Sequence, residues 1–131
     1  MAFISFTKSA DLKAPDDLRV NSTAVLYVEA SRPELMGRTM IHMLGQGALV
    51  NAVMESIATV ITALSVENFH LVECTRHYLA TPPHDGPSTV YISSKNVSYV
   101  RPNLPTLPTF WVVTFVDGSD MRITDPLPHG L

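Results

Sequence analysis

The segment 39–64 (TMIHMLGQGALVNAVMESIATVITAL) constrains the fold of this chain more than any other part of the sequence. Two glycines, Gly45 and Gly47, separate a Met/Ile/Leu-rich part from a strongly amphipathic run. If residues 39–44 form a strand, the glycines join that strand to a helix, whose N-terminal backbone N–H groups face any anion beyond the loop. If residues 39–44 are helical, the glycines only hinge two helices, and the basis for an anion site is lost.

Local sequence signals support both interpretations. Ser31 and Glu34 match a capping box with Pro33 in the first turn, so a helix is expected to begin there. It either ends near Gly37 as a short helix over 32–38, or it continues, since two interior glycines cost only roughly 2 kcal/mol relative to alanine. Continuation is favoured by an apolar stripe that steps by four and three residues: Met36, Met40, Met43, Gly47, Val50, Met54, Ile57, Ile61 and Leu64. On either interpretation, residues 48–66 are predicted to be helical.

The rest of the chain is predicted to be mainly β-structure. Residues 9–21 are expected to be a loop, residues 101–108 form a proline-rich spacer, and no internal repeat is found. Alternating apolar residues predict strands over 3–7, 23–29, 69–80 and 89–93, and a terminal hairpin of 109–116 with 119–124 around Asp117-Gly118. We therefore expect an α+β fold, a two-layer sandwich of one or two helices on a mostly antiparallel sheet, with an added C-terminal β-hairpin.

Composition limits the classes of function. The chain has 131 residues, 46% apolar and 16% charged, which indicates a globular chain of about one domain. We divide it into an N-terminal strand and loop (1–21), an α+β core (22–98) and a spacer with a hairpin (99–131). The net charge of −3 provides no global positive field, which weakens the case for RNA or DNA as a partner.

The same composition bears on location. A single cysteine, Cys74, excludes an intramolecular disulfide framework. The N-terminus lacks the pattern of a signal peptide, and no apolar run reaches the ~18 residues that a membrane span needs. A cytoplasmic protein without a membrane segment is expected.

Catalytic and metal-binding arrangements are weak in this sequence. His70 and Cys74 would share one face of a strand while His77 points to the other, and no Cys-x-x-Cys or His-x-x-x-His spacing is present. A nucleophilic Cys74 would need an adjacent base and a lowered pKa, and no base is placed for that role. No phosphate-loop lysine follows Gly47 and no complete dinucleotide fingerprint exists. We expect no metal, no cofactor and no enzymatic activity.

The order of predicted elements, together with residues 44–49 (LGQGAL) and Ala52-Val53, resembles the Alba superfamily. The glycine segment is similar to that of the bacterial stage V sporulation protein S relatives. Ile41-His42, the two glycines and Asn51 are also similar to the small Alba-like subunits of ribonuclease P and MRP. The resemblance covers about residues 39–93.

This resemblance implies a βαβαββ fold, dimerisation and binding of RNA or DNA. It implies that the glycine loop and a hairpin arm approach the nucleic-acid backbone. The implied contact residues are Gly45, Gln46, Gly47 and Asn51 at the phosphates, Arg38 near the first helix, and Arg76 and Lys95 beside the arm.

Two functional hypotheses follow from the sequence. The first is a non-enzymatic nucleic-acid-associated protein that contacts RNA or single strands through the Gly-x-Gly loop at a helix N-terminus. The alternative is a protein–protein assembly module, a homodimer or heterodimer without nucleic acid, that uses the Met-rich helical stripe and the aromatic C-terminal hairpin as contact surfaces.

Overall fold

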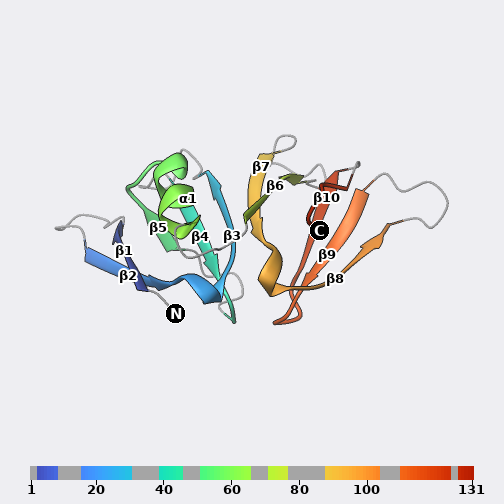
Figure 1. The fold of residues 1–131 in the computed structure, drawn as a ribbon, viewed down its shortest axis with the longest axis horizontal. Helices are drawn as coiled ribbons and strands as arrows, with labels where there is room; N and C mark the ends of the chain where they lie inside the picture. The colour runs from blue at the N-terminus through green and yellow to red at the C-terminus, as the bar shows by residue number, and fades with distance from the viewer. Residues whose placement is uncertain are drawn as a thin grey trace.

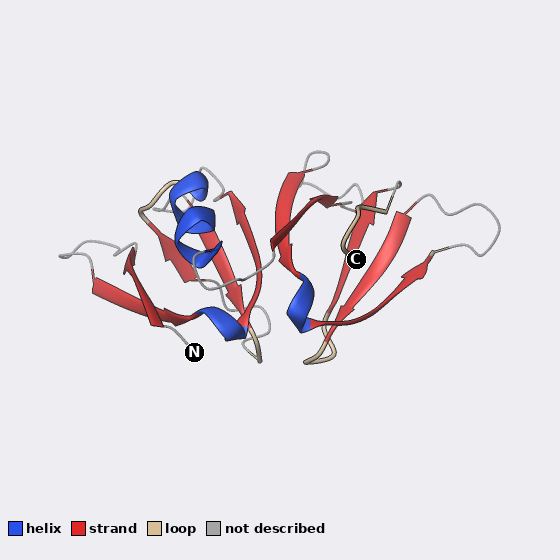
Figure 2. Cartoon of the chain, viewed as in Figure 1, coloured by secondary structure: helices blue, strands red, loops and turns tan. Residues whose placement is uncertain are grey.

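The described residues form an antiparallel sheet of ten strands with one short α-helix (Figure 1; Figure 2). The structure, a computed structural model, describes residues 3–8, 16–30, 39–45, 51–65, 71–76, 88–103, 110–124 and 127–131. The helix α1 (Ile57–Ser65) contacts β3 and packs on the first half of the sheet. In spatial order the strands are β2 (Asp16–Asn21), β1 (Phe3–Lys8), β5 (Asn51–Val53), β4 (Thr39–Met43), β3 (Val25–Ala30), β7 (Ser88–Ser93), β6 (Leu71–Arg76), β10 (Asp120–Thr124), β9 (Phe110–Phe115) and β8 (Val97–Pro102).

The sheet consists of two halves with the same topology. The first half has the strand order β2-β1-β5-β4-β3 and the second half has the order β7-β6-β10-β9-β8. In each half a hairpin leads through a short 3₁₀ turn, Ser22–Ala24 or Ser94–Asn96, into three strands that follow one another. The last of these strands then pairs with the first strand of its half. The chain is therefore duplicated in structure, and the expectation that it has no internal repeat was wrong.

The register of the strands shows how closely the two halves correspond. Val25 pairs with Met43, and a β-bulge lies between Val25 and Tyr27. In the second half Val97 pairs with Phe115, and the bulge lies between Val97 and Tyr99. Val97, Tyr99 and Phe115 each lie 72 positions after their counterparts Val25, Tyr27 and Met43 (97 − 25 = 72). The duplication therefore extends to the irregularities of the sheet.

Backbone hydrogen bonds repeat at the same spacing. The N–H of Leu44 donates to the carbonyl of Ala24 at 2.7 Å, and the N–H of Val116 donates to the carbonyl of Asn96 at 2.9 Å. Both bonds hold the end of a strand against the preceding 3₁₀ turn. The two halves thus use the same local device to turn the chain at this end of the sheet.

Each half has its own apolar core. The core of the first half contains Phe6, Val20, Val25, Val28, Ile41, Val53, Val60 and Leu64, the last two from α1. The core of the second half contains Leu26, Cys74, Val90, Ile92, Val113, Phe115, Met121 and Ile123, and Leu127 and Leu131 of the C-terminal tail pack against it. Because Leu26 and Val28 of β3 belong to different cores, this strand is part of both.

The halves join through β3 and β7, and this pairing is called the junction below. Tyr27, Val28 and Glu29 pair antiparallel with Ile92, Tyr91 and Val90. Near the 3₁₀ turns, the side-chain amide of Asn96 donates to the carbonyls of Thr23 and Val25, both at 2.8 Å. The junction therefore combines strand pairing with a side-chain clamp at one end.

The expected two-layer α+β sandwich is contradicted. The described residues form a predominantly β structure with α1 as its one α-helix. Of the described residues in the predicted helix over 48–66, Ile57–Ser65 are helical, while Asn51–Val53 pairs with β4. Val53 is completely buried in that strand, and its cross-strand pairing outweighs the helical spacing of the apolar residues. The βαβαββ order that the Alba resemblance implies is accordingly not the order of elements in this chain.

Several local predictions can be compared with the structure. Residues 39–43 form a strand, so of the two alternatives for residues 39–44 the strand is confirmed, and so is the terminal hairpin of β9 with β10. The loop expected over 9–21 was wrong at its end, because residues 16–21 form β2 against β1. The helix expected over 32–38 lies outside the described residues.

Candidate functional site

The first candidate site is the glycine loop, which the structure places between two strands. Gly45 lies in the turn after β4 with a φ of +76°, where a residue with a side chain would be strained. Asn51 opens β5, and α1 begins only at Ile57, with Ser56 accepting a hydrogen bond from the Thr59 N–H at 3.3 Å. The prediction that this loop lies at a helix N-terminus was therefore wrong.

Gly45 nevertheless donates its N–H to an anionic group, which belongs to this chain. Its N–H lies 3.0 Å from Oδ2 of Asp117, in the turn between β9 and β10. The other carboxylate oxygen accepts from the N–H of Ser119 at 3.0 Å and from its hydroxyl at 2.6 Å. These bonds, that of the Ser119 hydroxyl first, lower the pKa of Asp117 below 3.8 because they favour the ionised form. The equivalent turns of the two halves therefore touch.

This contact predicts a pH-dependent signal. Ionised Asp117 holds the Gly45 N–H, so the amide proton resonance of Gly45 should shift as the pH falls through the lowered pKa, at a midpoint below 3.8. The contribution of the contact to stability is fully present above the pKa of the unfolded state and is lost as the pH falls through the lowered pKa of the folded state. It is small because the carboxylate is exposed to solvent. An NMR titration measures the midpoint. Asp117→Ala should abolish the transition, and an unchanged titration in that variant would contradict the assignment.

The remaining predicted nucleic-acid contacts are distributed over the fold. Lys95 lies in the second 3₁₀ turn, at the same end of the sheet as Gly45. Arg76 ends β6, where it meets Glu29 at the other end of β3. Gln46, Gly47 and Arg38 are outside the described residues. The structure does not bring the described members of this set together into one surface. Binding of nucleic acid by these residues stays a prediction.

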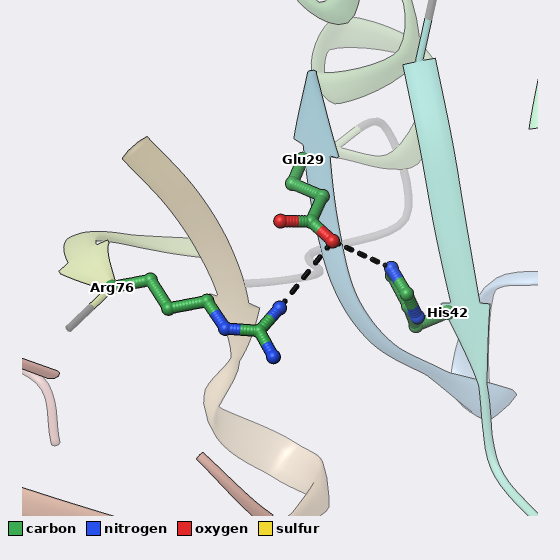
Figure 3. A network of polar contacts seen from close by, with 3 residues as sticks. All are labelled: Glu29, His42 and Arg76. Atoms are coloured by element: carbon green, nitrogen blue, oxygen red, sulfur yellow. Dashed lines mark hydrogen bonds and ion pairs between the residues drawn. The ribbon is translucent and has the colours of Figure 1, made fainter. Parts of the chain in front are cut away.

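A polar cluster at the junction was not found from the sequence (Figure 3). Glu29 on β3 has only 4% of its side chain exposed. Its Oε1 accepts from Nε2 of His42 on β4 at 2.9 Å and from Nη1 of Arg76 on β6 at 3.4 Å. A buried carboxylate requires such partners, since an unpaired one would be costly. Because Arg76 belongs to the second half, the cluster ties the two halves together.

Aromatic stacking surrounds this cluster. The rings of Tyr27 and His42 are stacked with centroids 4.0 Å apart, and Phe115 stacks on Tyr27 at 5.8 Å. The guanidinium of Arg76 lies 5.6 Å from the centroid of the Tyr27 ring, in the range of a cation–π contact. The sequence signal for this polar cluster was Glu29, a glutamate inside an otherwise apolar strand. A buried glutamate requires a partner, but sequence spacing alone does not identify that partner.

Cys74 has the properties of a core residue. The side chain is buried on β6, and its thiol donates to the carbonyl of Val72 at 3.4 Å. Burial, with the nearby charge of Glu73, raises the pKa of Cys74 to about 12, so the thiolate is scarce at neutral pH. Among the described residues no group of three or more His, Cys, Asp or Glu side chains is placed to hold a metal ion. His70 and His77 lie outside those residues.

The fold and the junction define the class of this chain as an internally duplicated, predominantly β protein. Comparison with protein-family models, with curated proteins and with solved structures finds no match. In the described part of the chain no helix has the length and apolar character required to cross a membrane. The function must therefore be inferred from the geometry of this chain.

Proposed function

We propose that this chain is a non-enzymatic cytoplasmic protein that assembles with itself through the open edges of its sheet. The two terminal strands, β2 and β8, have a strand partner on only one side in the described fold. An open strand edge presents unpaired backbone donors and acceptors, which another strand can satisfy. The main observation in support of self-assembly is that 54% of the surface of Tyr99, on β8, is exposed at such an edge.

Other contact surfaces considered from the sequence have less support. Met40 is buried in β4, so the Met-rich stripe is not a helical surface. The apolar residues Val113 and Phe115 of the C-terminal hairpin face the core of their own half. The amide of Gly45 is engaged by Asp117, which weakens the proposed role of the glycine loop in binding phosphate.

Self-association can be tested by sedimentation velocity over a range of protein concentrations. The wild-type chain should form species larger than its 14.4 kDa monomer, with a proportion that rises with concentration. Tyr99→Asp should abolish these species, because a charge placed on the edge strand opposes burial against a second chain. Val116→Asp is the matched control, since Val116 is similarly exposed at 53% but lies in the turn after β9. A wild-type chain that stays monomeric at all concentrations would overturn the proposal.

A further inference from the structure

The duplication relates the closed junction of the chain to its two open edges. β8 occupies in the second half the position that β3 occupies in the first, and β2 corresponds to β7 in the same way. Within the chain, β3 and β7 are paired with each other. Their counterparts β8 and β2 are the two ends of the sheet. An edge of the β3 type and an edge of the β7 type are thus both available for a neighbouring molecule.

We propose that copies of this chain join head to tail, with β8 of one copy pairing antiparallel with β2 of the next. This inference rests on the self-association proposed above and assigns its geometry. The internal junction pairs Tyr27 with Ile92 and Glu29 with Val90. Shifting each of these residues by the repeat spacing pairs Tyr99 with Val20 and Arg101 with Leu18 across the new junction.

The exposed apolar residues lie where this arrangement requires them. Tyr27 of the first half packs against the core of the second half, and its counterpart Tyr99 is 54% exposed. Leu71 of the second half packs against the core of the first half. Its counterpart is Phe3, since Leu71 pairs with Ser93 as Phe3 pairs with Asn21, and Phe3 is 63% exposed. Within the chain Tyr27 and Leu71 each pack against the core of the other half, whereas Tyr99 and Phe3 at the open edges have no neighbouring half beside them in the described fold.

The burial of whole strands agrees with this correspondence. Leu26, Val28 and Glu29 of β3 are all buried, Leu26 in the core of the second half. The equivalent positions of β8 are exposed at Ser98 and Arg101 and half-buried at Val100. The β8 strand therefore has the backbone geometry of β3, including its bulge, without the covering half.

The contact between copies is expected to be weaker than the internal junction. Arg101 and Thr114 replace Glu29 and His42, so the buried carboxylate and its histidine partner are not repeated. Because these interactions are lost, we expect the association between copies to be reversible. Because the joined edges are unlike, the interface is heterologous, and repetition gives a ring or an open filament rather than a two-fold dimer.

A mixing experiment with two edge variants tests the arrangement. Tyr99→Asp places a charge on the β8 edge and leaves the β2 edge intact. Phe3→Asp places a charge on β1 beside β2, where Phe3 pairs with Asn21, and leaves the β8 edge intact. Each variant alone should sediment as a monomer. An equimolar mixture should form a 1:1 dimer and nothing larger, since it contains one competent β8 edge and one competent β2 edge per pair.

Two controls accompany the mixing experiment. Val116→Asp should assemble as the wild-type chain does. Unchanged circular dichroism and melting temperature of the variants exclude loss of folding, because both replaced side chains are more than half exposed.

The possible failures are distinguishable. If the wild-type chain associates but one edge variant alone still dimerises, like edges pair with each other, and the head-to-tail arrangement is wrong while self-assembly stands. If the wild-type chain associates and the mixture stays monomeric, the assigned edges are wrong. If the wild-type chain does not associate, the proposed function itself fails.

Discussion

Replacing Glu29 with alanine should destabilise the protein by about 3 kcal/mol, because it removes the shared acceptor of His42 and Arg76 and leaves their donors without the carboxylate. Chemical denaturation monitored by circular dichroism measures the change. Glu73→Ala is the matched control: the same substitution on an exposed side chain of β6 should alter stability by less than about 0.5 kcal/mol.

A double-mutant cycle identifies the source of the loss. If Glu29 acts through Arg76, the combined Glu29→Ala and Arg76→Ala variant should be more stable than the sum of the single changes predicts, by roughly 0.5–3 kcal/mol. Equal losses for Glu29→Ala and Glu73→Ala would show that the cluster does not stabilise the junction.

Replacing Phe115 with alanine should cost about 3–5 kcal/mol, since its ring is 1% exposed, and its removal leaves a cavity between the core of the second half and Tyr27. Phe115→Leu retains most of the volume and should cost less than about 1.5 kcal/mol. Phe3→Ala makes the same change at a side chain that is 63% exposed, where the loss in dilute, monomeric protein should be within about 0.5 kcal/mol. Denaturation midpoints rank the three variants, and a Phe115→Ala variant as stable as Phe3→Ala would refute the assignment of this core.

Much of the β-structure was predictable from local patterns. Strand-forming patterns of apolar residues located β1, β3, β6, β7 and the hairpin of β9 with β10, and Asp117-Gly118 marked the turn of that hairpin. Within the helix predicted over 48–66, residues 51–53 were misassigned because the apolar residues of that segment also fit helical spacing. Pairing of Asn51–Val53 with β4 decides the conformation, and that pairing is a tertiary interaction. β2 was missed because its sequence is polar and follows a proline.

The duplication was hidden because the halves share few residues. Ser22, Val25, Tyr27 and Val28 recur as Ser94, Val97, Tyr99 and Val100, and elsewhere mainly the pattern of burial and pairing is common. The contact of Gly45 with Asp117 spans 72 residues, and that of Glu29 with Arg76 spans 47. No local pattern specifies such contacts. The sequence could therefore point to Gly45 as a donor to an anion, but could not show that the anion is a carboxylate of the same chain.

The placement of Leu26 and Val28 in different cores has a consequence for folding. The two side chains are two positions apart on β3, and each is buried by residues of a different half. Unfolding of either half would expose one of them to water and would also release the strand pairing of β3 with β7. Loss of structure in one half therefore raises the free energy of the other, and the duplicated chain should denature as one cooperative unit.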